Sequence, residues 1–405
     1  MTDPRQRAKI IGLLGCTQII SWGTLYYAFA ILGPEIQRET GWRTELVFGA
    51  FSWCILVAGL VAAPAGMLLD RFGGRSMMGL GSLLCGAGFL LLGTADTIAL
   101  YFIAWSVLGV AMALVLYEAA FATINREFVQ GARSAISTLA LFGGLASTVF
   151  WPLTLKLNGW LGWRDTYWLY GLLQLALCAP LHLLLTPGRR LPPVPQHSAA
   201  RAAAGFTLKQ ALRDPAFWKL AFAFAANTFI FSALSVHLIP LLQQFGHPIA
   251  SVVLLATLIG PMQVAGRIGE MAFARRVSPQ TVGKLTFAAL PAALLALVLC
   301  GERQWAAAAF CALYGLSNGV LTIVRGTIPQ TLYGRANYGA IAGALAGPSL
   351  LAKAAGPLAI AAAMQGKQSP YPILALLLLF SLASLGFYLA AIRSRSGIAA
   401  KVTPA

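Results

Sequence analysis

Three ionisable residues lie deep inside apolar runs that are long enough to cross a lipid bilayer. Glu118, Arg267 and Lys353 are each about 10 Å or more from the nearer end of their run, at ~1.5 Å of helical rise per residue. A charge at that depth costs at least ~2.5–3.5 kcal/mol, so each is a candidate functional residue. An arginine side chain can donate two parallel hydrogen bonds to a carboxylate, whereas a lysine side chain acts as a point charge. Two cations and one acid therefore predict an electropositive cavity that binds a small anion.

Polar and aromatic side chains at similar depth would orient such a ligand. Gln263 precedes Arg267 by four residues, which places the two on one helix face, and a tyrosine and an asparagine repeat that spacing in another run. The predicted orienting residues are Gln263, Tyr314, Asn318, Tyr117, Tyr26 and Tyr27.

Each charge also has a purely structural interpretation, and the sequence leaves these alternatives open. Arg267 lies three residues before Glu270, a spacing at which helical ion pairs form, although Glu270 is nearer the predicted end of the run. Lys353 could extend towards one end of its run and stay solvated. Glu118 could be a fixed counter-ion, or a group that takes up a proton when it is buried.

The elements that must position these residues are hydrophobic helices. Of the 405 residues, 58% are hydrophobic and only 10% are charged. Crossing the ~30 Å hydrocarbon core takes ~20 mostly apolar residues. Runs of that length are predicted at residues 10–33, 44–69, 76–94, 97–124, 134–157, 165–187, 216–242, 249–274, 281–301, 304–328, 339–364 and 370–392. We therefore predict an all-α membrane protein with twelve transmembrane helices.

The charge distribution predicts how the chain is oriented. The formal charge is +17, which in a soluble protein would indicate nucleic-acid binding, but no soluble domain is present to carry such a patch. Basic residues instead gather in alternate loops, including Arg275 and Arg276, and this bias places both termini in the cytoplasm. The first run is too long for a signal peptide and no cleavage site follows it. The six cysteines form no CxxC pair, so neither disulfides nor a metal site is expected. No cofactor is expected either.

A Pro- and Ala-rich loop at 188–215 divides the predicted spans six and six. We expect an N-terminal half at 1–187 and a C-terminal half at 216–405. Weak internal similarity supports a repeat, because "LGVAMALVLYEAAFATI" (108–124) aligns with "YGLSNGVLTIVRGTIPQ" (314–330) and sets Gly109 opposite Gly315.

The loop after the second run carries a family signature. Its "GMLLDRFGGR", within residues 64–81, resembles the G-x-L-x-D-R-x-G-R-[KR] motif of the major facilitator superfamily, with one extra residue before the last Arg. With twelve spans and a central loop, the resemblance covers nearly the whole chain and implies a transporter of two six-helix halves. It also implies that Asp70, Arg71 and Arg75 latch helix ends in one conformation.

Other stretches resemble the monocarboxylate porter and oxalate–formate antiporter branch. These are "YYAFAILGPEIQRETGWR" (26–43), "ARSAISTLALFGGLAST" (132–148) and the pair Gln263 and Arg267. Tyr314 and Asn318 match the tenth-span pocket of that branch. The resemblance implies that Arg267 binds the substrate carboxylate.

The chain departs from the branch at its proton site. Ala30 and Ile31 stand where animal members have a lysine, and Gln263 cannot titrate. Glu118 with Lys353 would substitute for that site, or the coupling would be anion exchange.

We therefore expect a monomeric secondary transporter of the bacterial inner membrane that carries a small organic anion, a monocarboxylate by resemblance, by proton symport or exchange. A proton-coupled exporter of drugs or other amphipathic compounds is the main alternative, and a membrane receptor without transport is a second. An enzyme is the least expected, because no nucleophile–base pair, metal-ligand cluster or nucleotide loop is visible.

Overall fold

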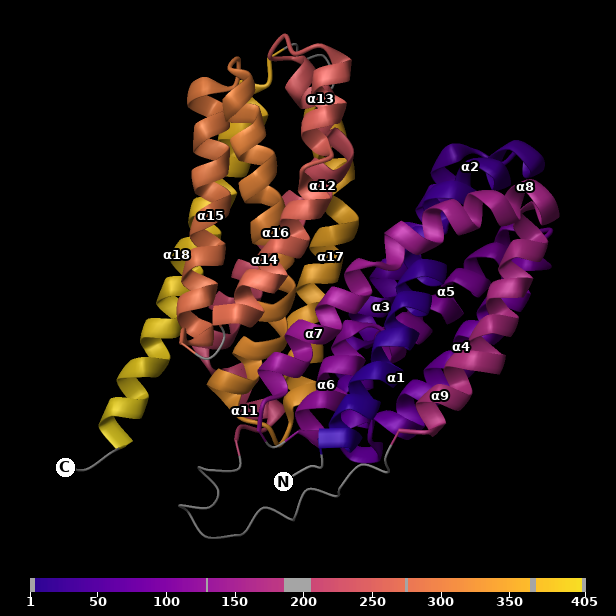
Figure 1. Cartoon of the computed structure of the whole chain (residues 1–405), viewed down its shortest axis with the longest axis horizontal. Coiled ribbons are helices and arrows are strands. Elements are labelled where there is room, and N and C mark those ends of the chain that lie inside the picture. Colours follow the sequence, from indigo (N-terminus) through magenta and orange to yellow (C-terminus); the bar gives the residue numbers. More distant parts are fainter. Residues whose placement is uncertain (1–3, 129, 186–204, 274–275, 365–368, 403–405) are drawn as a thin grey trace. The chain divides into compact units, whose positions relative to one another are not determined.

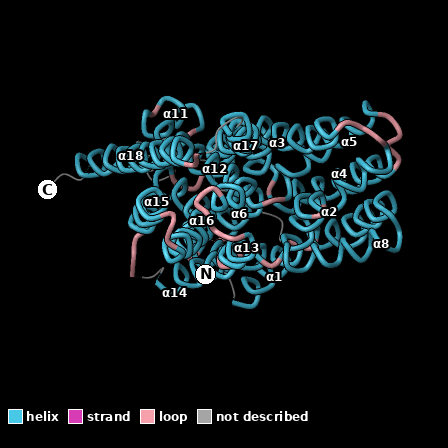
Figure 2. Tube along the Cα trace, turned by 90° about the horizontal axis from the view of Figure 1, so that it is seen from above, coloured by secondary structure: helices cyan, strands magenta, loops and turns pink. Residues whose placement is uncertain are grey.

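The computed structural model describes residues 4–128, 130–185, 205–273, 276–364 and 369–402. Within these ranges the chain is helical with short connecting loops and contains no strand (Figure 2). The predicted all-α class is confirmed. Residues 188–204 of the predicted central loop lie outside the described residues, as does Arg275, one of the predicted cytoplasmic arginines.

The chain divides into two compact units. The first comprises Met1–Thr207 and Tyr333–Gly347, and the second comprises Leu208–Leu332 and Pro348–Ala405. Their border at Thr207 falls inside the predicted central loop. The assignment of 1–187 and 216–405 to separate six-helix halves stays a prediction.

The helices of the first unit are mostly long and apolar. They are α1 (Pro4–Trp22), the π-helix η1 (Gly23–Tyr27), α2 (Phe29–Thr40), α3 (Thr44–Phe72), α4 (Gly74–Gly93), α5 (Ile98–Val115), α6 (Tyr117–Glu127), α7 (Ala132–Gly144), α8 (Ala146–Leu173), the π-helix η2 (Gln174–Cys178) and α9 (Ala179–Leu183). Within this unit, α5 packs along both α3 and α4 (Figure 1).

The second unit holds the remaining described helices. They are α11 (Leu208–Arg213), α12 (Pro215–Gln243), α13 (Ile249–Ala256), α14 (Ile259–Phe273), α15 (Pro279–Cys300), α16 (Gln304–Tyr333), α17 (Tyr338–Met364) and α18 (Tyr371–Val402). Here α18 packs along both α12 and α15 (Figure 1). Helix α17 is shared, because the unit border falls between its residues Gly347 and Pro348.

Eleven of the described helical segments are long and apolar enough to cross a membrane. One of them, Ala132–Leu183, has 52 residues, or ~78 Å at ~1.5 Å per residue, more than twice the ~30 Å hydrocarbon core. Gly162 interrupts it with a non-helical φ of 77°. This segment accounts for two predicted spans, at 134–157 and 165–187, so the predicted twelve agree with the structure.

The glycines aligned by the internal repeat both lie at close helix crossings. A Cβ on Gly109 of α5 would lie 2.6 Å from the carbonyl oxygen of Cys54 in α3. A Cβ on Gly315 of α16 would likewise lie 2.6 Å from the carbonyl oxygen of Ile259 in α14. Only glycine permits this approach of two backbones. The two aligned glycines therefore have the same packing role in their respective units.

The fourth predicted span, 97–124, is interrupted where the sequence shows no helix breaker. Leu116 has extended dihedrals, φ −81° and ψ −165°, and separates α5 from α6. Neither glycine nor proline is present at the break. The side chain of Gln18 in α1 donates from Nε2 to the Val115 carbonyl oxygen at 2.6 Å, and so satisfies one backbone group that the break leaves free.

Candidate functional site

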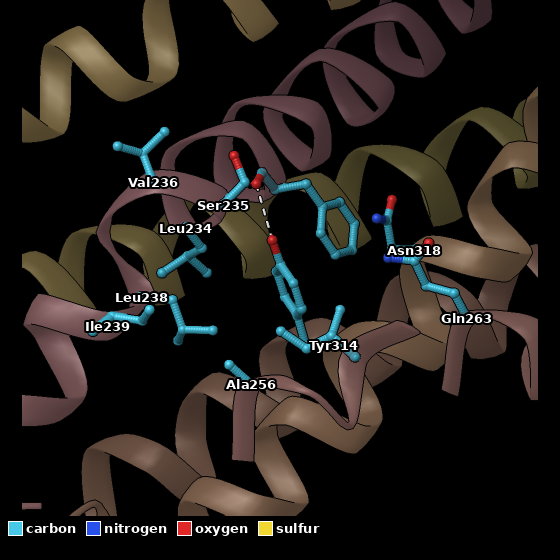
Figure 3. A pocket seen from close by; sticks show the side chains of 11 residues that line it. Leu234, Ser235, Val236, Leu238, Ile239, Ala256, Gln263, Tyr314 and Asn318 are labelled. Carbon is cyan, nitrogen blue, oxygen red and sulfur yellow. Dashed lines mark hydrogen bonds between the residues drawn. The ribbon is translucent and has the colours of Figure 1, made fainter. Parts of the chain in front are cut away.

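A pocket of about 320 Å³ lies in the second unit and contains three of the predicted orienting residues (Figure 3). Gln263 of α14 and Tyr314 and Asn318 of α16 all line it. The rest of its wall comes mainly from α12 and is mostly apolar, for example Leu234 and Leu238, with Ser235 as a polar exception. The sequence had not predicted that α12 contributes, since its residues there lack charge.

Tyr314 is fixed across the pocket. Its hydroxyl donates to the carbonyl oxygen of Phe231 in α12 at 2.9 Å, and its side chain is buried. Its ring centre lies 4.6 Å from that of Phe231 and 5.5 Å from that of Phe310. In Figure 3 the Tyr314 hydroxyl points to α12, while the Asn318 and Gln263 side chains lie together on one side of the ring. Tyr314 therefore forms a rigid wall, and the two amides supply polar atoms.

Glycines bring α14 and α16 close enough for Arg267 to reach across. A Cβ on Gly319 would lie 2.2 Å from the Gln263 carbonyl oxygen, and one on Gly266 would lie 2.8 Å from the Leu316 carbonyl oxygen. At this crossing Arg267 donates from Nε to the Gly319 carbonyl oxygen at 3.4 Å.

Arg267 is buried one turn along α14 from the pocket-lining Gln263, with 7% of its surface exposed. It is not among the residues that line the pocket. Glu270, three residues later, is 6% exposed. The acid is thus as buried as the arginine, although it lies nearer the predicted end of the run. Binding of a substrate carboxylate by Arg267 stays a prediction.

Lys353 lies in α17, is half-buried and is not among the residues that line the pocket. Its carbonyl oxygen accepts a hydrogen bond from the Ser232 hydroxyl of α12 at 2.6 Å. Pro357, four residues later, has no N–H to offer that carbonyl. Ser232 therefore replaces a helical bond that Pro357 removes.

The three predicted tyrosines of the first unit cluster around a tryptophan. The ring centre of Trp22 lies 5.6 Å from that of Tyr26, 6.4 Å from that of Tyr27 and 5.0 Å from that of Tyr117. The Tyr117 hydroxyl donates to the Ala140 carbonyl oxygen at 3.3 Å. Trp22 was missed, although its position four residues before Tyr26 was a usable signal.

Glu118 lies in the first turn of α6, directly after the break at Leu116, and is half-buried. A helix N-terminus carries free N–H groups and a partial positive charge, so it favours a carboxylate. The sequence revealed the acid but not the helix end beside it. Glu118 belongs to the first unit, whereas Arg267 and Lys353 belong to the second.

Of the three predicted latch residues, Asp70 meets a helix end. Its carboxylate accepts hydrogen bonds from the backbone N–H groups of Gly339 at 2.9 Å and Ala340 at 2.8 Å, in the first turn of α17. These segments lie within the first unit. Arg71 and Arg75 are exposed, and the Arg71 guanidinium lies over the neighbouring Phe72 ring.

Two other arginines, which the sequence did not single out, bond the backbone near Asp70. Arg126 donates to the carbonyl oxygens of Leu69 and Asp70. Arg335 donates to the Asn125 carbonyl oxygen, and burial lowers the pKa of its guanidinium from the usual value.

Among the described residues, no group of three or more His, Cys, Asp or Glu side chains could hold a metal ion.

The sequence matches a family model over most of its length and two curated proteins over about half of it. The model of the Major Facilitator Superfamily matches residues 13–357. An uncharacterized 38 kDa protein of Thermoproteus tenax is 28% identical over 224 residues, covering 55% of this chain and 56% of that protein. The uncharacterized transporter YcxA of Bacillus subtilis is 25% identical over 217 residues, covering 49% of each. The chain thus spans about half the length of the curated relatives it matches.

Solved structures share the fold at low identity. The human organic anion transporter MFSD10 (TETRAN) superposes with a TM-score of 0.69 and 17% identity, covering 95% of this chain and all of that one. The Escherichia coli fucose:proton symporter FucP superposes with a TM-score of 0.67 and 14% identity, covering 94% of this chain and 98% of that one.

Proposed function

Since this chain belongs to the major facilitator superfamily and is a multi-pass membrane transporter, we propose that it moves a small organic anion, of the monocarboxylate class, by alternating access. The observation that carries the proposal is Arg267, buried one turn from the pocket-lining Gln263. A guanidinium cannot shed its charge, so a buried one needs anionic or polar partners.

The pocket beside Arg267 supports a small substrate. Its volume of about 320 Å³ is at the lower end of ligand sites, which span ~300–1,000 Å³. The amides of Gln263 and Asn318 could bond a carboxylate or a neighbouring hydroxyl. Tyr314 would form one wall, and Lys353 of α17 would make the electrostatic potential at the pocket more positive. In the first unit, Tyr26, Tyr27 and Tyr117 would provide an aromatic surface for the substrate.

Glu118 is our candidate for the proton or charge-balancing site. It is an acid placed at a helix N-terminus inside a membrane span. Proton symport and anion exchange are the two forms of coupling that we propose. MFSD10 and FucP carry an organic anion and fucose with a proton, respectively, according to their names, and their likeness to this chain shows the fold alone.

We further propose that the transporter is monomeric and lies in a bacterial inner membrane, with both termini in the cytoplasm. The alternate placement of basic loops supports this orientation. Asp70 would stabilise one conformation of the transport cycle through its bonds to Gly339 and Ala340.

The test is uptake of labelled monocarboxylates into proteoliposomes. Hydrogen bonds to charged groups contribute ~1.5–3 kcal/mol, so Arg267→Ala should weaken apparent affinity by about tenfold or more. Arg267→Lys should rescue little, because Lys lacks the planar fork. Arg303→Ala, which removes an exposed arginine, is the matched control. Uptake by Arg267→Ala equal to that of wild type would refute the proposal.

A proton-coupled exporter of amphipathic compounds is the second candidate. The apolar wall of the pocket and the aromatic cluster around Trp22 favour it. If the substrate is a lipophilic cation, Arg267→Ala should bind it more tightly than wild type does. Equilibrium binding of a fluorescent cation to both proteins separates the two candidates.

A further inference from the structure

The break between α5 and α6 leaves backbone oxygens without their helical partners inside a membrane span. In a continuous helix the Glu118 N–H would bond the Leu114 carbonyl, and the described residues contain no such bond. The neighbouring Val115 carbonyl accepts from Gln18 Nε2. The carbonyl end of α5 also carries the negative partial charge of its helix dipole.

Two side-chain oxygens of α1 also lack partners. Among the described residues, Gln18 Oε1 and Ser21 Oγ have no hydrogen-bond partner, and both side chains are 0% exposed. Ser21 differs in this from its neighbours Thr17 and Thr24, whose hydroxyls bond the carbonyl oxygens of Leu14 and Ile20. Leaving such groups unpaired in a buried site is costly, so a bound species is expected to satisfy them.

Geometry places these oxygens at the break. The Gln18 amide is anchored through Nε2 at the Val115 carbonyl, so its Oε1, on the same carbon, lies beside that carbonyl. Ser21 is three residues from Gln18, on the same face of α1. The oxygens are all neutral. The sequence has no Lys or Arg between Ile10 and Tyr27, or between Ile98 and Tyr117, that would repel a cation.

We propose that the break between α5 and α6 binds a dehydrated monovalent cation, with Gln18 Oε1, Ser21 Oγ and the freed Leu114 carbonyl as ligands, beside the Val115 carbonyl that Gln18 Nε2 already bonds. Unwound carbonyls and helix C-termini are suited to such an ion. Neutral donors alone do not compensate the dehydration of a divalent ion, which favours a single charge.

Binding of the ion is independent of the substrate. A role of the ion in driving transport rests on the proposed function. In that role the ion gradient would drive uptake in place of a proton gradient, since Gln263, at the proton site of the branch, cannot titrate.

The test is the thermal stability of the purified full-length protein in detergent, with choline chloride replaced by NaCl at constant ionic strength. Selective binding to the folded state raises the melting temperature in a saturable way. We expect Na⁺ to do so in wild type, and LiCl and KCl series rank the ions by size. Gln18→Met and Ser21→Ala should lose the Na⁺-dependent shift, whatever their stability in choline.

Ser381→Ala is the matched control, because it also removes a buried serine hydroxyl, one that is bonded to the Leu378 carbonyl. It should keep the full Na⁺ shift. Equal melting temperatures in Na⁺, Li⁺, K⁺ and choline would overturn the proposal. Water would then be the species that bonds the free oxygens at the break. Binding of radiolabelled Na⁺ to wild type, measured directly, decides the matter if either variant fails to fold.

The outcomes separate this inference from the proposed function. Loss of monocarboxylate uptake in Arg267→Ala with an intact Na⁺ shift supports both. If Na⁺ raises the melting temperature but the protein transports no organic anion, the ion site is supported and the proposed substrate class is refuted. Uptake without any Na⁺ shift overturns the ion site alone.

Discussion

Gly319 lies so close to Gln263 that a Cβ on the glycine would be 2.2 Å from the Gln263 carbonyl oxygen. Because that atom belongs to a helix backbone, it cannot move aside as a flexible side chain would. The approach sets the distance between α14, which carries Arg267, and α16, which carries Tyr314 and Asn318. It therefore sets how Gln263 of α14 lies relative to Tyr314 and Asn318 of α16 in the pocket wall.

Gly319→Ala should separate α14 from α16 and lower both stability and uptake. Overpacking of this kind costs ~1–3 kcal/mol. Gly269→Ala in α14 is the control, since a Cβ there meets nothing within 4 Å, and it should be neutral or slightly stabilising. Melting temperature and uptake are measured for both. Equal values for the two variants would show that the crossing tolerates a methyl group.

Ser232→Ala should destabilise the protein by ~1–3 kcal/mol, because the Lys353 carbonyl then loses its donor. Pro357→Ala restores a backbone N–H four residues after Lys353. In the Pro357→Ala background, Ser232→Ala should lower the free energy of unfolding markedly less. A double-mutant cycle on melting temperature measures the difference. Strict additivity would mean that Ser232 does not compensate for Pro357.

Asp70→Ala should destabilise the protein by ~0.5–2 kcal/mol, the usual effect of losing a side chain that caps a helix N-terminus. Asp70→Asn keeps one acceptor oxygen and should recover part of the loss. Asp96→Ala is the control, because that carboxylate is exposed and pairs with Arg164 on the surface. If Asp70→Ala and Asp96→Ala melt alike, the bonds to α17 contribute nothing measurable.

Glu118→Gln keeps the shape of the side chain and removes its charge. If Glu118 carries the proton, uptake driven by an inward proton gradient should fall to the rate measured without a gradient, while counterflow persists. If the protein is an exchanger, both rates should stay near wild type. Loss of counterflow as well would indicate a structural role and exclude proton transfer as its sole task.

Periodicity and composition were sufficient to predict the all-α class and the spans. They also indicated residues that the structure brings together, since Gln263, Tyr314 and Asn318 share one pocket. Both signals follow from helical spacing, which the sequence shows directly. The functional roles of these residues, and of Arg267, Lys353 and Glu118, stay predictions.

Features that depend on tertiary partners could not be predicted. The break at Leu116 has no glycine or proline, and it is accommodated by the side chain of Gln18, 97 residues away in the chain. The π-helix η1 is joined to η2 by a hydrogen bond from Gln174 Nε2 to Thr24 Oγ1 at 3.1 Å, and hydropathy carries no signal for it. Pro357 was visible in the sequence, but its compensating donor Ser232 was not.

Helix α17 passes from one compact unit to the other at Gly347 and Pro348. Pro348 has no N–H, so the Ala344 carbonyl lacks its helical partner at that turn, and bending stiffness there is lower than in an unbroken helix. Helix α17 is continuous through this point, so a displacement of one unit against the other would bend the helix here. If the proposed alternating access displaces the units, the bending would concentrate in the turn before Pro348.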